Sequence, residues 1–339
     1  MGWEHDWLSF AKVKKNDEFY TRLEDIKNEL SHYKQYFQGK TVLCNCDDVF
    51  FSNFALYFLK NFKILGLKKL IVTGIPVLEN HDRSVLVTKI VSVDGMVGTS
   101  LIKRLASIKE NTGNSIKSVE DDKDFCAGDF RSEISVALLK ESDIVVTNPP
   151  FSLFKDFLPL LLKYNKKFII VGNKNAVTYK EIFPAFMHNE VWIGFTSMNG
   201  GQWMVVPKNQ EVDTKFKKVL DNGSVLVNIA GVCWFTNLDI EKRHWWLNLT
   251  KKYSPNVYRK YDNFDAINVD KVEDIPMDYD GIMGVPITFL DRYNPLEFEI
   301  VGKIDFGNLD EYLIANPVVD GNKIYKRIAI KRKSDFSLC

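Results

Sequence analysis

The chain has 339 residues, of which 45% are hydrophobic and 13% aromatic, so it can bury a large core and is not an intrinsically disordered polymer. Its 45 Lys and Arg residues against 44 Asp and Glu residues leave a formal net charge of +1, so a role on nucleic acid requires locally clustered basic residues. The five cysteines form no C-x-x-C pair, which indicates free thiols in a reducing cytosol, and we expect no metal site, membrane span or signal peptide.

The N-terminal segment predicts an arm followed by a helix. Residues 1–16 hold two tryptophans and a small lysine cluster, which fits either an arm that touches DNA or a solvated tail. Helix signals begin at Asp17, and apolar residues at helical spacing continue as far as Phe37. The hydroxyls of Tyr20 and Thr21 fit a ligand contact, and they fit ordinary chemistry at the start of a helix equally well.

Residues 41–172 alternate between apolar strands and amphipathic helices, which predicts a mainly parallel sheet in an α/β fold. We expect strands at 41–46, 68–72, 85–93 and 167–172, another that ends near 130, and helices at 53–65, 100–110 and 152–163. Asp48 or Ser52 is expected to cap the helix that follows the first strand. The inner side of the last helix carries a stripe of core residues, Phe154, Phe157 and Leu161.

A short buried strand with an abrupt end organises the chain. Residues 144–146 are β-branched, as in a strand covered on both faces. Pro149 and Pro150 end this strand, because neither residue can donate to a sheet and both have a fixed φ. Ligands of open α/β sheets lie at the carboxyl ends of the strands, and here Asn148, backbone carbonyls and the ring of Phe151 converge at such an end.

This elbow fits chemistry on the exocyclic amino group of a base. Such a nitrogen is a poor nucleophile, because its lone pair is delocalised into the ring. The side-chain oxygen of Asn148 and the carbonyl of Pro149 are two acceptors that can localise the lone pair without being ionised. Phe151 offers a face on which the base can stack, a contact worth ~1–3 kcal/mol.

The Asn-Pro-Pro-Phe elbow resembles the D/N/S-P-P-F/Y motif of S-adenosylmethionine-dependent amino-methyltransferases, in which N-P-P-F is commonest among enzymes that methylate adenine N6 in DNA. Further blocks, in family order, are similar to those of the EcoRI-type adenine-specific DNA methyltransferases. They are DEFYT (17–21), CNCDD (44–48), GDFRS (128–132), KYDNFDAINV (260–269) and GVPITFL (284–290). The resemblance runs from about residue 17 to about residue 300 and is weakest between about 75 and 120.

The resemblance implies a Rossmann-like S-adenosylmethionine-dependent methyltransferase fold with a smaller C-terminal DNA-recognition region. It implies that the catalytic residues are Asn148, Pro149, Pro150 and Phe151. It implies that the cofactor-binding residues are Tyr20, Thr21, Asn45, Asp47, Asp48, Gly128, Asp129 and Phe130. Tyr20 and Thr21 would contact the methionine end of the cofactor and Asp47 or Asp48 its ammonium group. Asp129 would accept from the adenine amino group, with Phe130 packed on that ring.

The chain departs from the wider methyltransferase pattern in two places. The loop after the first strand is usually glycine-rich so that the backbone can approach the cofactor, but no glycine occurs between Thr41 and Leu65. The second strand is followed by Thr73-Gly74-Ile75-Pro76, so the acid that would bind the ribose stays unassigned.

Two segments are candidates for contact with DNA. Residues 190–206 and 225–237 predict further strands, and in the turn between 194 and 203 the side chains of Ser197, Asn199 and Gln202 fit either base reading or a plain hairpin turn. Between 242 and 261, aromatic residues are interleaved with basic ones, which fits phosphate binding or a solvated surface. These basic residues are Lys242, Arg243, Lys251, Lys252, Arg259 and Lys260.

We therefore expect a catalytic domain at 1–237, with an arm at 1–16, and a target-recognition region at 238–339. The expected reaction is methyl transfer from S-adenosylmethionine to N6 of a flipped-out adenine in double-stranded DNA, in a restriction-modification or related system. The alternatives are methylation of cytosine N4, RNA or a protein glutamine, or a catalytically silent DNA-binding relative. We expect a cytoplasmic monomer whose cognate endonuclease, where one exists, acts separately.

Overall fold

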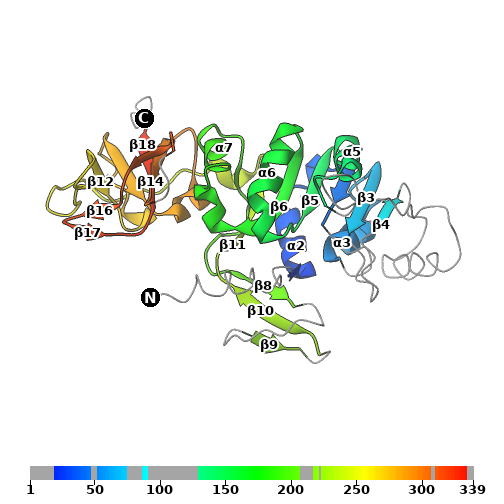
Figure 1. The fold of residues 1–339 in the computed structure, drawn as a ribbon. Helices are drawn as coiled ribbons and strands as arrows, with labels where there is room; N and C mark the ends of the chain where they lie inside the picture. Colours follow the sequence, from blue (N-terminus) through cyan, green and yellow to red (C-terminus); the bar gives the residue numbers. More distant parts are fainter. Residues whose placement is uncertain are drawn as a thin grey trace, which may run out of the picture. The chain divides into compact units, whose positions relative to one another are not determined.

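The chain forms two compact units (Figure 1). The computed structural model describes residues 19–46, 52–74, 86–90, 129–206, 217–220, 223–306 and 310–333, with only the backbone of 86–90. The first unit consists of Met1–Asn173 with Gly200–Leu238, and the second consists of Lys174–Asn199 with Asp239–Cys339. The second unit thus includes residues 174–199 in addition to the C-terminal region that the sequence indicates.

A mainly parallel sheet is the centre of the first unit. Its strands are β2 (Thr41–Cys44), β3 (Lys69–Gly74), β4 (Leu86–Ile90), β5 (Ile144–Thr147), β6 (Lys167–Asn173) and β11 (Val232–Thr236). They lie in the order β4-β3-β2-β5-β6-β11. The four inner strands pair in parallel, whereas β4 and β11 pair antiparallel to their neighbours. This arrangement confirms the predicted sheet and the expected strands within 41–46, 68–72, 85–93 and 167–172.

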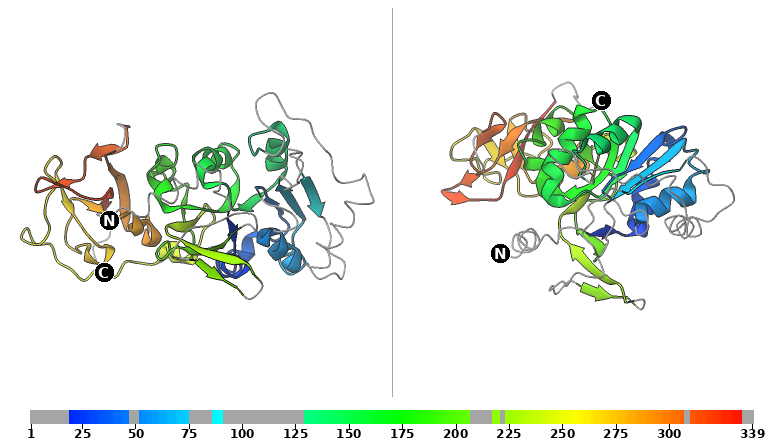
Figure 2. Two further views of the ribbon diagram at one scale, coloured as in Figure 1. Left: turned by 60° about the horizontal axis from the view of Figure 1, so that its bottom comes forward. Right: turned by 45° about the vertical axis from the view of Figure 1, so that its right-hand side comes forward.

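Helices cover both faces of this sheet. They are α2 (Leu23–Leu30), α3 (Asn53–Asn61), α5 (Glu133–Glu141) and α6 (Phe154–Lys163), with short 3-10 helices η1 (Lys34–Tyr36) and η2 (Phe151–Leu153). The chain passes from β2 through α3 to β3 on one side, and from β5 through α6 to β6 on the other. Right-handed crossovers therefore place α3 and α6 on opposite faces, as Figure 2 shows.

Burial explains why these segments form these elements. Every residue of β2 and β5 is buried, which fits strands covered on both faces. The predicted stripe on α6 is confirmed as core, since Phe154, Phe157 and Leu161 are at most 1% exposed. The Ser52 hydroxyl accepts from the backbone N–H of Ala55 at 3.1 Å, so Ser52 is the helix cap of α3.

A small antiparallel sheet completes the first unit. Its strands are β1 (Tyr20–Thr21), β8 (Gln202–Val205), β9 (Lys217–Val219) and β10 (Val225–Ile229), in the order β1-β8-β10-β9. Because Tyr20 and Thr21 pair with β8, α2 begins at Leu23 and not at the expected Asp17. The region 225–237, expected as one strand, turns at Gly231, where φ is +77°.

The second unit contains a five-stranded sheet that the sequence patterns did not predict. Its order is β12-β13-β18-β14-β15, and β16 and β17 form a separate hairpin. The strands are β12 (Ala266–Asn268), β13 (Ile282–Val285), β14 (Phe298–Ile304), β15 (Leu313–Ala315), β16 (Val318–Val319), β17 (Asn322–Lys323) and β18 (Arg327–Arg332). The remaining elements are α7 (Phe183–Met187), β7 (Trp192–Ile193) and the 3-10 helices η3 (Lys174–Thr178), η4 (Glu241–His244), η5 (Val272–Asp274) and η6 (Ile287–Arg292).

Some expectations fall on residues that the structure does not describe. The helix expected at 100–110 and the strand expected before 129 lie outside the described ranges. Within those ranges, no helix is long and apolar enough to cross a membrane. The described part of the chain also contains no group of three or more His, Cys, Asp or Glu side chains that could hold a metal ion.

Candidate active site

The order of strands creates a switch point between β2 and β5. From these two adjacent parallel strands the chain winds outward in opposite directions, to β3 and to β6. Their carboxyl ends lie at the same edge of the sheet, and ligands of open α/β sheets bind at such a position. Asn45 follows β2 directly and Asn148 follows β5 directly, so the fold brings two side-chain amides of the predicted site to this edge.

Hydrogen bonds tie β2 and β5 together at both ends. At the carboxyl end, the Thr147 hydroxyl donates to the backbone carbonyl of Asn45, and Thr147 is fully buried. At the amino end, the backbone N–H of Thr41 donates to the Asp143 carboxylate at 2.7 Å, and the N–H of Asp143 donates to the Thr41 carbonyl at 2.9 Å. These hydrogen bonds therefore restrain the loop after β2 and the loop after β5 relative to each other.

The Asn148 side chain has a defined orientation. Its Nδ2 donates to the backbone carbonyl of Phe19 at 2.5 Å, and a carbonyl can only accept, so this contact decides which way the amide points. Its Oδ1 is buried and has no partner among the described residues. An unpaired buried acceptor costs ~1–3 kcal/mol, which a ligand that donates to it would recover.

The two prolines and Phe151 hold the elbow in the predicted shape. Pro149 is buried, and Pro150 is extended with φ −54° and ψ 126°. Its carbonyl accepts from the N–H of Leu153 at 3.0 Å, which starts the 3-10 helix η2 at Phe151. The ring of Phe151 is half-buried, so part of it is accessible beside Asn148.

Two side chains near this edge have orphaned polar atoms that fit a cofactor. Thr21 is 2% exposed and Asn45 is 5% exposed, and neither Thr21 Oγ1 nor Asn45 Oδ1 has a partner in the described part of the chain. The backbone carbonyl of Thr21 accepts from Asn53 Nδ2 at 2.8 Å, which fixes β1 beside the first turn of α3. Tyr20 is half-buried on the same strand. Asp47, Asp48 and Gly128 lie outside the described residues.

Cys46 has a left-handed backbone conformation. Its φ is +61°, in the region that favours glycine, and it lies in the loop where the wider methyltransferase pattern has glycines. The chain thus adopts a glycine-like conformation in this loop without a glycine. Backbone strain of this kind costs on the order of 1 kcal/mol and is concentrated at functional sites in proteins.

Asp129 and Phe130 make contacts that the sequence did not predict. Both oxygens of the Asp129 carboxylate accept from the Arg131 guanidinium, at 2.9 and 2.7 Å, and the N–H of Arg131 also donates to it. Phe130 is 5% exposed, and its ring packs edge-on against Phe157 of α6 with the centroids 5.0 Å apart. Phe130 is therefore a core residue, and Asp129 already has a strong ion pair.

The candidate base-reading residues have different environments. Gln202 on β8 is 7% exposed, and neither polar atom of its amide has a partner among the residues described. It lies on the buried face of β8, two residues from Met204, which pairs with Thr21. Asn199 lies in the turn before β8, and its side chain is exposed. Gln202 is thus an interior polar residue, whereas Asn199 is accessible.

Two of the expected phosphate-binding residues already have partners within the protein. The Lys242 side chain is 10% exposed, and its ammonium group forms an ion pair with Asp291 at 2.6 Å. The half-buried Arg243 stacks 3.7 Å from the centroid of the Trp192 ring and donates to Asn189 at 3.1 Å, and burial lowers its pKa. A phosphate would have to displace these partners, and direct phosphate contact by the two residues stays a prediction.

The remaining four basic residues are exposed. Arg259 and Lys260 are paired with Asp320 and Asp265, each at 2.8 Å. Exposed pairs of this kind are worth about 0–1 kcal/mol, so a phosphate could replace the carboxylate at little cost. The ammonium groups of Lys251 and Lys252 have no partner among the described residues. These two lysines are therefore exposed cations that a phosphate could reach without displacing a described carboxylate.

Sequence reasoning missed Thr147 and Asp291. Thr147 has no role in the sequence-based prediction, although a hydroxyl at the end of a buried strand requires a partner. Asp291 directly follows the mostly apolar stretch 284–290, and an acid at the end of such a stretch is a candidate for a buried ion pair. Their partners, Asn45 and Lys242, are 102 and 49 residues away in the chain.

Comparison with known proteins identifies the family. A family model described as adenine-specific methyltransferase EcoRI matches residues 7–335. The Type II methyltransferase M.EcoRI of Escherichia coli is 44% identical over 332 residues, which cover 96% of each chain. The Type II methyltransferases M.MgeORF184P of Mycoplasma genitalium and M.MpnI of Mycoplasma pneumoniae are each 37% identical, over 95% and 97% of this chain and 98% and 99% of the respective relatives. No solved structure matches the chain significantly. The whole-length match and the placement of the Asn-Pro-Pro-Phe elbow agree, and the chain belongs to the EcoRI family of adenine-specific methyltransferases.

Proposed function

We propose that the protein transfers a methyl group from S-adenosylmethionine to N6 of an adenine at a specific sequence in duplex DNA. The orientation of Asn148 carries this proposal. Its amide nitrogen is held by the Phe19 carbonyl, so its buried oxygen is left to accept a hydrogen bond from a substrate. A side chain held in this way recognises an N–H donor, and an adenine amino group is such a donor.

The chain's own residues would act mainly by positioning. Asn148 Oδ1 and the Pro149 carbonyl accept from the two N–H bonds of the target amino group, which localises the nitrogen lone pair. The part of the Phe151 ring that is accessible stacks on the base, a contact worth ~1–3 kcal/mol. N6 takes part in base pairing, so the adenine has to leave the stack before these groups can reach it. Correct placement of two reactants can by itself lower the activation barrier by about 7–11 kcal/mol.

The cofactor would lie at the carboxyl ends of β2 and β5. When bound, S-adenosylmethionine supplies an electrophilic methyl group on a positively charged sulfur. Thr21 and Asn45 would hold it, since each has an orphaned buried oxygen. Tyr20 and Asp129 would contribute beside them, and Asp47, Asp48 and Gly128 follow from the family resemblance. The methylated amino group would lose its extra proton to water, so we assign no general base.

The wider organisation is part of the proposal. The first unit would be a Rossmann-like catalytic region, and the C-terminal region 238–339 would contribute to recognition of double-stranded DNA through Lys251, Lys252, Arg259 and Lys260. The protein would act in the cytoplasm as a monomer, in a restriction-modification system whose endonuclease acts separately.

Methyl transfer with a matched pair of variants tests the function. Purified protein is incubated with labelled S-adenosylmethionine and unmethylated genomic DNA, and the nucleosides are analysed. We expect N6-methyladenine from the wild type and from Asn28→Ala, an exposed asparagine of α2 in the first unit. Asn148→Ala should lower turnover by about 100-fold or more, as loss of one preorganised hydrogen-bonding group does elsewhere, with cofactor affinity nearly unchanged.

The other outcomes distinguish the alternatives. Label in N4-methylcytosine would overturn the assignment of adenine, and label absent from DNA although the cofactor binds would overturn DNA as the substrate. Because Asn148 also contacts Phe19, thermal denaturation of Asn148→Ala has to show that the variant is folded. Asn148→Asp keeps an acceptor oxygen at this position and should retain more activity than Asn148→Ala.

A further inference from the structure

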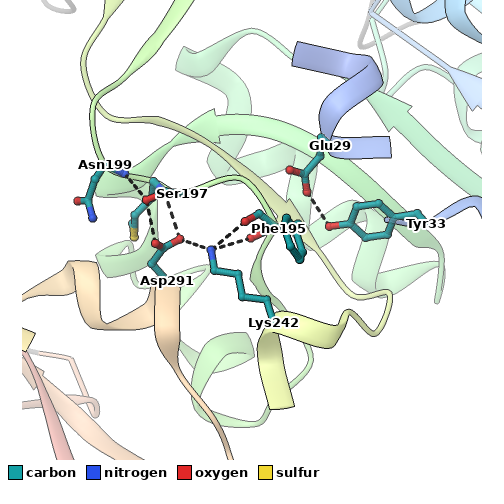
Figure 3. A network of polar contacts seen from close by, with 9 residues as sticks. Glu29, Tyr33, Phe195, Ser197, Asn199, Lys242 and Asp291 are labelled. Carbon is teal, nitrogen blue, oxygen red and sulfur yellow. Dashed lines mark hydrogen bonds and ion pairs between the residues drawn. The ribbon is translucent and has the colours of Figure 1, made fainter. Parts of the chain in front are cut away.

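A buried ion pair in the second unit has no part in the proposed chemistry. Lys242 is the second residue of η4, and Asp291 lies in η6 (Figure 3). Their side chains are 10% and 6% exposed, and the Lys242 ammonium donates to Asp291 Oδ1 at 2.6 Å. Removing two charges from water is costly, and replacing such a pair with apolar residues is often neutral or stabilising. This pair therefore suggests a role other than stability.

Both members of the pair hold the same turn, residues 194–199. Lys242 donates to the backbone carbonyls of Phe195 at 3.0 Å and Gly194 at 3.4 Å. Asp291 accepts from the Ser197 hydroxyl at 2.9 Å and from the N–H of Met198 at 3.2 Å. The Ser197 hydroxyl in turn accepts from the backbone N–H of Asn199 at 3.2 Å, so the network holds the turn up to the backbone of Asn199 (Figure 3).

Asn199 lies at a surface pocket of about 210 Å³. The walls of this pocket come from the turn and from the elements η5 and η6, all within the second unit. They are Asn199, Asp270, Lys271, Val272, Glu273, Pro286, Thr288 and Arg292. Asp291 belongs to the same short helix as Thr288 and Arg292, so a single residue restrains both the turn and one wall.

The chemistry of the lining fits the edge of a base better than a phosphate. Glu273 and Arg292 pair with each other at 3.1 Å, and Asp270 accepts from Asn268 at 2.8 Å and contacts Arg327 at 3.2 Å. A phosphate site would present donors alone, whereas this pocket presents both donors and acceptors. The Asn199 amide supplies one donor and one acceptor side by side, which matches the N6 and N7 positions of adenine in the major groove.

We propose that Asn199 reads a base of the recognition sequence and that Lys242 and Asp291 are positioning residues that hold it at this pocket. The proposal rests on the proposed function, since it requires DNA as the substrate. The buried pair would restrict the turn to one conformation, so that Asn199 loses little conformational freedom when it binds a base. The base pair that Asn199 contacts is distinct from the adenine that is methylated at Asn148.

The test measures discrimination between DNA sites. Wild type and variants methylate unmethylated genomic DNA with S-adenosylmethionine, and sequencing that detects N6-methyladenine ranks sites that differ from the preferred one by one base pair. Asn199→Ala should relax discrimination at one position by about 10- to 100-fold, because a good amide–adenine contact is worth ~1–3 kcal/mol. Asn28→Ala, at an exposed position of α2, is the control and should keep the wild-type ranking.

A charge-free double variant separates positioning from folding. Lys242→Met with Asp291→Leu leaves no unpaired buried charge, but the Phe195 carbonyl and the Met198 N–H lose their partners. Its melting temperature should therefore be lower than that of the wild type while the variant stays folded. It should nevertheless relax discrimination at the same base-pair position as Asn199→Ala, which a merely structural pair would not do.

Three outcomes would overturn the inference. An unchanged ranking for Asn199→Ala would remove its base-reading role, while the proposed function would stand if Asn148→Ala is inactive. Relaxation by Asn199→Ala without relaxation by the folded double variant would remove the positioning role of the pair. Absence of methyl transfer to DNA by the wild type would overturn the proposed function together with this inference.

Discussion

The Thr147 hydroxyl donates to the backbone carbonyl of Asn45 and so joins the carboxyl ends of β5 and β2. One of these residues precedes Asn148, the proposed catalytic amide, and the other has a buried, orphaned side-chain oxygen that we propose contacts the cofactor. The contact would therefore link the proposed positions of the two substrates. Thr147→Val should lose about 1–3 kcal/mol of stability, because the Asn45 carbonyl is left unpaired. It should also lower cofactor affinity and turnover.

Thr236→Val is the matched control for this prediction. Its hydroxyl is also fully buried and donates to a backbone carbonyl, that of Phe168, at 2.7 Å. Phe168 lies at the amino end of β6, away from the proposed site. The two variants would be compared by their stability in chemical denaturation, their affinity for S-adenosylmethionine in calorimetry and their rate of methyl transfer in a single turnover. Equal losses of cofactor affinity in both variants would contradict a specific role for Thr147.

Cys46 should respond to substitution according to its left-handed φ of +61°. Cys46→Gly should be stabilising by roughly 0.5 kcal/mol, since relief of strain outweighs the greater freedom of glycine in the unfolded chain. Cys46→Val should be destabilising by about 1–2 kcal/mol, because a β-branched residue tolerates this conformation poorly. Chemical denaturation of both variants measures the difference, and a glycine variant less stable than the valine variant would show that the thiol matters more than the backbone.

Lys251 and Lys252 should contribute to DNA affinity through phosphates. Each is exposed, and substitution of either by Ala should weaken binding about equally for all sequences. Each substitution should also reduce the steepness with which the logarithm of the DNA-binding constant falls with log salt concentration, by about 1. Lys27→Ala, an exposed lysine on α2, is the control. Fluorescence anisotropy between low and moderate salt would measure the slopes, and unchanged slopes would place the DNA elsewhere.

Glu297 should make stability depend on pH. It is 4% exposed, its carboxylate accepts from the N–H of Leu247 at 3.0 Å, and burial raises its pKa. The folded state therefore binds the proton on Glu297 more tightly than the unfolded state does. Protonated Glu297 contributes fully to the free energy of unfolding below the ordinary glutamate pKa, and this contribution is lost as the pH rises through the raised pKa. Glu297→Gln cannot ionise and should gain stability relative to the wild type as the pH rises through the raised pKa of Glu297.

Melting temperatures from pH 4 to pH 8 would show this difference. Glu299→Gln, on β14 two residues after Glu297, is the control, because Glu299 is exposed. The difference in melting temperature between Glu299→Gln and the wild type should stay nearly constant with pH. A constant difference for Glu297→Gln as well would contradict the effect of burial.

Several features of this protein were predictable because they depend on residues close together in the chain. Two consecutive prolines end β5 whatever surrounds them, since both lack an N–H and fix φ, and so the elbow around Asn148 could be predicted. The cap at Ser52 and the apolar stripe that includes Phe157 are equally local, because capping and helical period act over a few residues. The family resemblance rests on short blocks of this kind.

The tertiary structure decided which way polar and charged groups face. The Asn148 amide is oriented by the carbonyl of Phe19, which is 129 residues away. Lys242 and Lys251 look alike in the sequence, but the first is buried against Asp291 and the second is exposed. A side chain's charge is encoded locally, whereas its partner and its solvation depend on which distant segments the fold brings beside it. That is why the sequence by itself determined the family and the catalytic elbow, and only the folded chain separated base-reading and phosphate-binding candidates from positioning residues.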